Sequence, residues 1–341
     1  MGPGPVGRFS VSTLMLAVAV GGLVLGCSGG ESNSASHITA RIDVPGHPFR
    51  IAAGRDFVWV LTRGLAGACA PPRQPCTVVR IDPRSNRVVG NPISLPRDAW
   101  DLAVGAGSVW VTQFDGRILR IDARTGRTTP ISARPLYFGS VVSFGGGFVW
   151  TGNDDERNDA GSIARISPTD NRIVGTPLLP APRSSPQSIS FSGGALWVAD
   201  HAGWLVKIDA AKFTVVARQR LDFGPHGVVA TRDAAYVADA HANRLLEADP
   251  RTTRIRRVAK MSPGPIFPVF GAGSLWSSSA AHWSGETGTR DDRVLRIDPA
   301  SLEIAEVLHV GGDVPSVAFA FGSVWAADSV GRVARIMPPS R

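Results

Sequence analysis

Histidines and carboxylates gather in two neighbouring stretches of this chain, and they are the side chains best suited to chemistry. His226 precedes Asp239 and His241 by 13 and 15 residues, and Asp200 and His201 stand earlier in the chain. Converging imidazoles and carboxylates can ligate a metal ion or exchange protons as general acid and base. The same residue types also occur at solvated ends of loops, so both interpretations stay open until the elements that carry them are known.

A repeated aromatic landmark indicates which elements carry these residues. It recurs at spacings of 51, 40, 47, 39, 40 and 49 residues, at Trp59, Trp110, Trp150, Trp197, Tyr236, Trp276 and Trp325. A second landmark, usually isoleucine followed by aspartate, trails each aromatic and begins at Ile81, Ile121, Ile166, Ile208, Ala248, Ile297 and Ile336. Internal repeats of this length indicate a fold built from copies of one structural unit.

The pattern within each repeat predicts four short β-strands. Leu119 and Ile121 alternate with Arg120 and Asp122, and a period of two is typical of a strand. Glycines before the landmark aromatics and Asp-Pro pairs after the second landmark favour tight turns. Repeats of four strands and about 40 to 50 residues are typical of propeller blades. We therefore predict an all-β fold, a seven-bladed β-propeller of four-stranded blades, over residues 38–341.

The two ends of the repeat region are incomplete in complementary ways. The last repeat lacks a fourth strand before Pro338, whereas residues 38–44 have a strand pattern with no complete repeat in front of them. We expect the N-terminal strand to close the last blade, because this pairing completes the ring and removes an exposed sheet edge.

Two sets of aligned positions vary between repeats, and ligand specificity would reside in such variation. The first set lies ten residues before the landmark aromatic, or nine in the last repeat, and consists of Phe49, Trp100, Ser140, Gln187, His226, Ile266 and Ser316. The second lies three residues after it and consists of Thr62, Gln113, Asn153, Asp200, Asp239, Ser279 and Asp328. We predict a ligand-binding face formed by Phe49, Trp100, Gln187, Asp200, His201, His226, Asp239 and His241. Solvated loop ends are the alternative.

Residues 1–26 have the pattern of an export signal. Arg8 precedes an apolar run from Val11 to Leu25, and the small residue Gly26 stands before Cys27. This arrangement resembles the bacterial lipoprotein signal, and the resemblance implies cleavage before Cys27 and lipidation of its sulfur. An uncleaved anchor or a plain signal peptide is the alternative. Residues 27–37 are mostly small and polar, which is typical of a flexible tether.

Two further cysteines, Cys69 and Cys76, lie within the repeat region. An even pair in an exported protein favours a disulfide bond. A pair without further cysteines or histidines nearby makes a poor zinc site, because structural zinc takes four ligands. We expect a Cys69–Cys76 disulfide, and neither a metal centre nor a cofactor.

Residues 102–112, followed by Arg120-Ile121-Asp122, resemble the YncE-like (YVTN) propellers and the related streptogramin lyases. The resemblance extends over about residues 38–341 as a repeat pattern, and it implies the fold more strongly than an activity. The Gly-His and Trp-Asp pairs of WD40 blades are missing. The lyases use histidines of successive blades with a glutamate and magnesium. Here only His226 matches that motif, because Ile266 stands at the equivalent place in the next blade, and this departure argues against lyase activity.

Arginine carries nearly all of the basic charge, since lysine occurs only at positions 207, 212 and 260 and the formal net charge is +8. Arg80, Arg120, Arg165 and Arg335 recur at one strand position, which spreads cations round the ring instead of forming a patch. Interleaved aromatics for stacking single-stranded nucleic acid are missing, so no nucleic-acid partner is expected. Anionic lipid headgroups or wall polymers fit this charge better.

These features predict a monomeric, extracytoplasmic lipoprotein attached to a bacterial membrane by its lipid anchor. Its propeller would bind or scaffold a protein or cell-envelope ligand. The alternatives are a metal-dependent lyase or hydrolase related to streptogramin lyase, and an extracytoplasmic sensor module. Whether the chain catalyses any reaction stays open at the level of sequence.

Overall fold

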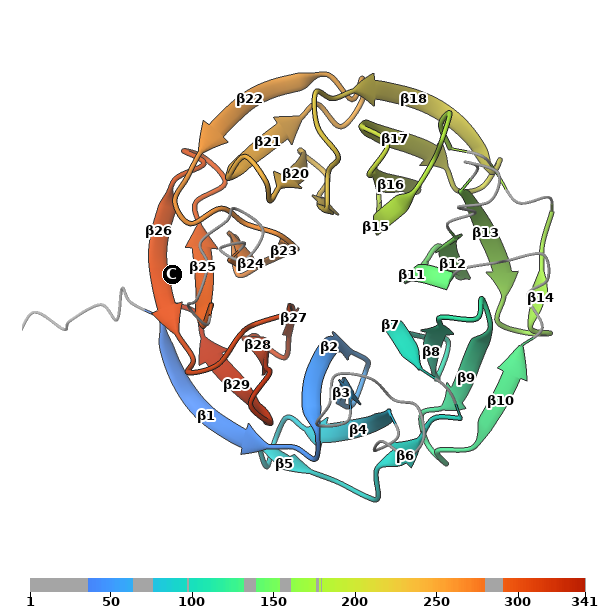
Figure 1. Cartoon of the computed structure of the whole chain (residues 1–341), viewed down its shortest axis with the longest axis vertical. Coiled ribbons are helices and arrows are strands. Elements are labelled where there is room, and N and C mark those ends of the chain that lie inside the picture. The colour runs from blue at the N-terminus through green and yellow to red at the C-terminus, as the bar shows by residue number, and fades with distance from the viewer. Residues whose placement is uncertain are drawn as a thin grey trace, which may run out of the picture. The chain divides into compact units, whose positions relative to one another are not determined.

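The structure is a computed structural model, and it describes residues 36–63, 76–96, 98–131, 139–153, 161–175, 178, 180–279 and 291–340. These residues form 29 β-strands, and no helix is found among them. All the strand pairs are antiparallel, and the strands make seven sheets arranged as the blades of a ring (Figure 1). The predicted all-β, seven-bladed propeller is therefore confirmed.

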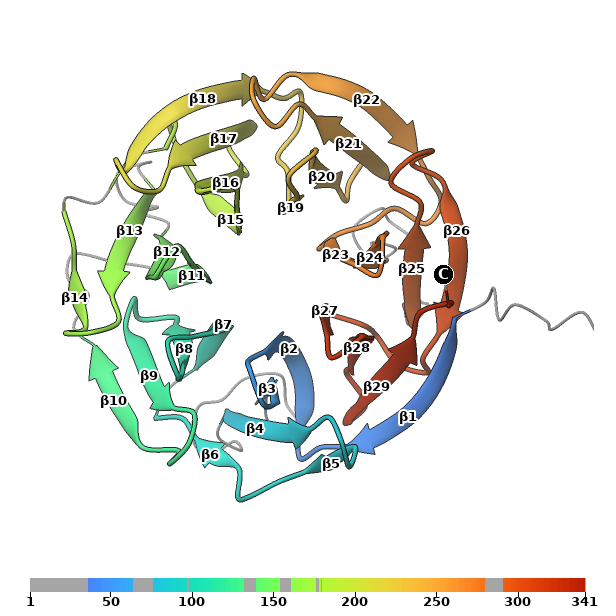
Figure 2. The same cartoon turned by 180° about the vertical axis from the view of Figure 1, so that it is seen from behind.

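Within each blade the strands run from an inner strand A beside the axis, through B and C, to an outer strand D (Figure 2). Blade 1 contains β2 (His47–Ala53), β3 (Val58–Arg63), β4 (Thr77–Asp82), β5 (Arg87–Val88) and β6 (Ile93–Ser94). Blade 2 contains β7 (Ala99–Gly105), β8 (Ser108–Gln113), β9 (Ile118–Asp122) and β10 (Thr128–Ile131). Blade 3 contains β11 (Gly139–Gly145), β12 (Phe148–Asn153), β13 (Ser162–Ser167) and β14 (Arg172–Ile173).

The remaining blades follow the same order along the chain. Blade 4 contains β15 (Pro186–Ser192), β16 (Ala195–Asp200), β17 (Trp204–Asp209) and β18 (Thr214–Arg220). Blade 5 contains β19 (Gly227–Ala230), β20 (Ala235–Asp239), β21 (Arg244–Ala248) and β22 (Ile255–Lys260). Blade 6 contains β23 (Val269–Gly271), β24 (Ser274–Ser278), β25 (Arg293–Ile297) and β26 (Ile304–His309). Blade 7 contains β27 (Ser316–Ala320), β28 (Ser323–Asp328), β29 (Arg332–Met337) and β1 (His37–Asp43).

Blade 1 departs from the predicted four strands because its outer strand is interrupted. Both β5 and β6 pair with β4, at opposite ends of that strand. Gly90 lies between them with a φ of 71°, and Pro92 follows without a backbone N–H to donate.

The N-terminal strand closes the ring as predicted. Strand β1 pairs antiparallel with β29, from His37 opposite Met337 to Asp43 opposite Arg332. The buried side chains of Ile42 and Val44 join a cluster with residues of blades 1 and 7. The first and last parts of the described chain therefore share one sheet.

The landmark tryptophans lie in the cores of the blades and between them. Trp110 is fully buried, and its indole N–H donates to the carbonyl of Gly105 at 3.1 Å, which satisfies its one polar group. A Cβ on Gly105 would lie 2.0 Å from the ring of Phe144 in blade 3. Glycine is required here because the next blade packs directly on this backbone.

Strand C cations join neighbouring blades, which explains the recurring arginines. The guanidinium of Arg120 in blade 2 donates to the carbonyl of Pro168 at 2.7 Å and to Asn171 Oδ1 at 2.8 Å, both in blade 3. It also bonds Ser108 Oγ at 2.8 Å and lies 5.0 Å from the centre of the Trp110 ring. One side chain thus connects two blades and covers the core tryptophan.

Four other blades use an equivalent contact to a carbonyl in the turn that joins strands C and D of the next blade. The pairs are Arg80 to Ala123, Arg165 to Ala210, Lys207 to Pro250 and Arg335 to Pro83. The recurring strand C cations therefore have a structural role between blades, and their recurrence is a weaker indication of an anionic partner than the sequence suggested.

Blades 5 and 6 are also connected to the next blade by side chains, but through different residues. In blade 5, Glu247 occupies the cation's position and pairs with Arg257, which donates to the carbonyl of Pro299 at 2.8 Å. In blade 6, Arg296 bonds Glu306 at 3.0 Å, and that carboxylate accepts from the backbone N–H of Ser36 at 3.0 Å. No turn between strands C and D exists in blade 7, because its strand D comes from the other end of the chain.

Several predicted features of the chain lie outside the described residues. The export signal over residues 1–26, Cys27 and Cys69 all belong to this set, as does the tether up to residue 35. Cys76 is fully buried directly before β4, and its predicted bond to Cys69 stays a prediction. Within the described part of the chain, no helix is long and apolar enough to cross a bilayer.

Candidate functional site

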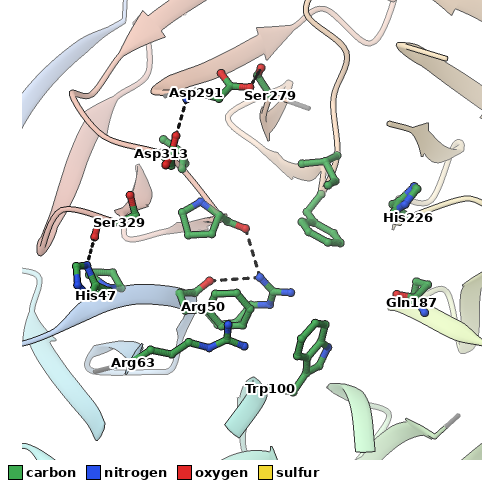
Figure 3. Close-up of a pocket in the computed structure, with 16 residues that line it drawn as sticks. His47, Arg50, Arg63, Trp100, Gln187, His226, Ser279, Asp291, Asp313 and Ser329 are labelled. Carbon is green, nitrogen blue, oxygen red and sulfur yellow. Dashed lines mark hydrogen bonds between the residues drawn. The ribbon is translucent and has the colours of Figure 1, made fainter. Parts of the chain in front are cut away.

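A cavity of about 350 Å³ lies where the inner ends of six blades converge (Figure 3). Its walls come from the starts of strands A, the ends of strands B and the connections beside them. This is the face on which the ligand site was predicted. The lining residues are His47, Pro48, Phe49, Arg50, Arg63, Trp100, Gln187, His226, Ile266, Phe267, Ser279, Asp291, Asp313, Val314, Pro315 and Ser329.

Four residues of the predicted binding face line this cavity: Phe49, Trp100, Gln187 and His226. Three of them share a backbone feature. The register of strand A against strand B shifts between Pro48 and Arg50, and again between Ala99 and Asp101 and between Pro186 and Ser188.

Phe49, Trp100 and Gln187 are thus the extra residues of β-bulges, each without a directly paired partner across the sheet. A bulge re-aims the side chain of its extra residue and is common beside functional sites. The bulge occurs at the same place in these three blades. The residue ten positions before the landmark aromatic therefore lies in the cavity wall in each of them. Whether these residues bind a ligand stays a prediction.

Asp200 and Asp239, also assigned to the binding face, are fully buried and do not line the cavity. Asp200 accepts hydrogen bonds from the backbone N–H groups of Ser185 at 2.9 Å and Ala202 at 3.0 Å. Asp239 accepts from Ala242 N at 3.1 Å and pairs with Arg244 at 2.6 Å. Both carboxylates therefore stabilise the turn that follows strand B, which is a structural role.

The three predicted histidines form a contiguous row beside the cavity. The ring centres of His201 and His226 are 5.3 Å apart, and those of His226 and His241 are 4.9 Å apart. Only His226 lines the cavity, whereas His201 lines a separate, more open hollow with Trp204 and Arg220. Among the described residues, no group of three His, Cys, Asp or Glu side chains has an arrangement that could hold a metal ion.

Burial lowers the pKa of His226 to about 4, and the neighbouring imidazoles of His201 and His241 add to the effect. The Asp239 carboxylate opposes the shift. His226 is therefore neutral at physiological pH. A general base with this pKa is poorly matched to work near neutrality.

This depressed pKa predicts a loss of stability in mild acid. The unfolded chain binds more protons than the folded chain between the ordinary value of 6.5 and about 4, so stability falls as pH decreases through this range. From about pH 7 to about pH 5 we expect the wild type to lose about 1 kcal/mol more than His226→Gln. Urea unfolding at both pH values measures this. Equal losses in the two proteins would show that His226 does not titrate in this way.

Sequence reasoning missed two arginines that dominate one wall of the cavity. Arg50 directly follows the first bulge, and Arg63 is the last residue of β3. The Arg63 guanidinium lies 3.4 Å and the Arg50 guanidinium 4.2 Å from the centre of the Phe49 ring. The Trp100 and Phe49 rings meet edge to face at 5.8 Å. The only signal for Arg50 and Arg63 in the sequence was that they directly follow the aligned residues Phe49 and Thr62.

Arg50 is fixed by the surrounding protein. Its Nη1 donates to the carbonyls of Phe49 at 3.3 Å and Pro315 at 3.4 Å (Figure 3). Its Nε lies 3.6 Å from Asp101 Oδ1. Burial lowers the pKa of Arg50 and raises the pKa of Asp101, while their mutual attraction opposes both shifts. The charge of Arg50 is thus matched within the protein.

Arg63 is in a different situation. Burial and the nearby charge of Arg50 lower the pKa of Arg63 to about 10, and the Asp98 carboxylate opposes this shift, so the guanidinium stays charged at neutral pH. Its Nη2 is shielded from solvent, and within the described parts of the chain no group accepts a hydrogen bond from that nitrogen. A buried donor without an acceptor costs about 1 to 3 kcal/mol, more when charged.

Comparison with known proteins supports the fold and leaves the family open. No family model matches the chain, and no curated protein matches it. A solved structure titled as the WD40 β-propeller domain of Doa1 superposes with a TM-score of 0.67 at 11% sequence identity. The match covers 89% of this chain and 97% of that one. At this identity the likeness shows the fold alone, since propellers carry many unrelated functions.

Proposed function

We propose that this chain is a binding module held at the extracytoplasmic face of a bacterial membrane by a lipid on Cys27. The axial cavity is its ligand site, and the ligand is a component or product of the cell envelope. Affiliation with the YncE-like propellers belongs to the same proposal and rests on the repeat pattern. The observation that carries the binding role is the preformed cavity with bulged residues from several blades in its wall.

Binding fits the polar groups of this face better than acid–base catalysis does. The Asp200 and Asp239 carboxylates are engaged by backbone N–H groups and Arg244. His226 is neutral near pH 7, and its lowered pKa would suit a general base only under acidic conditions. Concave, mostly apolar sites with a few placed polar groups are typical of ligand pockets, and this cavity has that composition.

Site-specific photo-crosslinking in intact cells tests the binding role. A benzophenone side chain in place of Gln187 reports on the cavity, and the same side chain in place of Val258 on β22 is the control, because Val258 is 54% exposed at the outer rim. We expect a discrete adduct from position 187 only, weakened by Trp100→Ala. Identical adducts from both positions, or none from position 187, would overturn the proposal.

The lipid anchor has its own test, because it is independent of the cavity. Metabolic labelling with an alkyne fatty acid, followed by membrane fractionation, is expected to label the wild type and leave it with the membranes. Cys27→Ser should lose the label and the membrane association together. A Cys27→Ser protein that is still labelled would place the lipid elsewhere.

A further inference from the structure

We infer that the axial cavity takes a small free ligand in which a carboxylate, or a monoanion of similar size, is joined to a flat apolar body, and that Arg63 receives the anion. The inference rests on the proposed binding function and names the ligand class. Its first support is the buried Nη2 of Arg63, for which the described chain offers no acceptor.

None of the contact ion pairs among the described residues involves Arg63, although the Asp98 carboxylate is near enough to attract its charge. Arg50, whose guanidinium also lies against the Phe49 ring, is by contrast bound to two carbonyls and lies beside Asp101. An anion in the cavity would therefore accept a hydrogen bond from Nη2 of Arg63 and would also be attracted by the charge of Arg50. A guanidinium can present two parallel N–H groups to a carboxylate, which strengthens and orients the contact.

The carboxylates of the cavity lie on the opposite side, which fixes where an anion can sit. Figure 3 places Asp291 and Asp313 across the cavity from Arg63 and Trp100. Asp291 pairs with Arg293 at 2.8 Å, and Asp313 accepts from the backbone N–H of Asp291 at 2.6 Å. These negative charges disfavour an anion on their own side of the cavity. On the arginine side, the carboxylates of Asp98 and Asp101 act on Arg63 and Arg50 but do not line the cavity, so the arginines are the charged groups of that wall.

A flat apolar body suits the remaining walls. Trp100, Ile266, Phe267 and Val314 line the cavity with apolar surface. The Arg50 guanidinium lies 5.1 Å from the Phe267 ring and 5.7 Å from the Trp100 ring, which places both rings near the two arginines. Aromatic and guanidinium faces favour a planar group by stacking. The volume of about 350 Å³ is at the low end for ligand pockets, so the ligand is small.

Calorimetric titration of the full chain with 2-naphthoate and its neutral isostere 2-naphthamide tests this ligand class. We expect 2-naphthoate to bind one to one and the amide to bind about tenfold more weakly, since the anion–guanidinium contact is lost. Arg63→Gln should weaken 2-naphthoate about tenfold and abolish the preference for the acid. The matched control is Arg117→Gln, because that side chain is 56% exposed and paired with Asp115 on the surface.

Equal affinity for the acid and the amide, no saturable binding of 2-naphthoate, or unchanged binding by Arg63→Gln would each overturn the inference. Thermal unfolding of Arg63→Gln within a few degrees of the wild type shows that a loss of affinity is not a loss of fold. Failure here together with a position 187 adduct in cells would reject the ligand class and keep the binding role. Failure of both experiments would reject the binding role as well.

Discussion

A chain that lacks residues 1–46 is expected to unfold at a midpoint temperature at least about 10 °C below that of a chain that begins at Asn33. The deletion removes β1 and with it the strand D of blade 7. It exposes the partners of Ile42 and Val44, each side chain contributing about 2 kcal/mol of burial, and leaves the edge of β29 unpaired. The total, about 5 kcal/mol, is comparable with the whole stability of an ordinary domain.

The chain that begins at Asn33 is the matched control for this deletion. It retains Ser36, whose backbone N–H bonds Glu306, and all of β1. Scanning calorimetry or circular dichroism on both proteins measures the difference. If the shorter chain melts with the control, ring closure by β1 does not stabilise the propeller, and the strand is only an appendage.

Replacing Arg335 with methionine is expected to lower the free energy of unfolding by about 3 kcal/mol. Its guanidinium crosses from blade 7 to blade 1, where it donates to the carbonyl of Pro83 at 2.6 Å and to Asn86 Oδ1 at 2.9 Å. It also lies 4.9 Å from the centre of the Trp325 ring. Its Nε also donates to Ser323 Oγ at 2.9 Å, within blade 7. Methionine keeps the apolar stem and removes all the donors, so all three acceptors lose a charge-assisted partner.

Arg117→Met is the control for this substitution, because it removes an arginine from an exposed turn and is expected to change stability by less than about 0.5 kcal/mol. Denaturant unfolding of the two variants gives the comparison directly. A loss for Arg335→Met no larger than that of Arg117→Met would mean that the cations between blades are incidental. The recurring arginines would then need another explanation, such as the anionic partner suggested by the sequence.

The repeat made most of the fold predictable. A strand has a period of two and a hairpin turn needs residues that accept positive φ, so strands and turns leave local marks in the sequence. Ala106 and Gly107 both adopt positive φ at the predicted turn of blade 2. The local pattern of strands and turns is weak in a single repeat, but it recurs at the same positions in seven repeats. The interruption of the outer strand in blade 1 was missed, because Gly90 and Pro92 mark a turn equally well inside a strand and between two repeats.

The candidate site was predictable only in part. The alignment found Phe49, Trp100, Gln187 and His226 because they hold one position in the repeated unit. It could not separate these cavity residues from the buried carboxylates of the second aligned set, since position along a strand does not reveal whether a side chain is already bonded. Asp200 was assigned to the ligand face on this ground, and it is held by the adjoining turn.

The sequence by itself determined the all-β class, the number of blades and the closing strand, because these follow from periodicity and from hydrogen bonds that neighbouring segments must make. Only the tertiary structure decided which polar groups are already satisfied. Arg120 is used between blades and Arg63 has an unmatched donor beside the axis, although both are arginines in or at the end of strands. The difference lies in what other blades bring near each guanidinium, and such contacts join residues too distant in the chain for local pattern to specify.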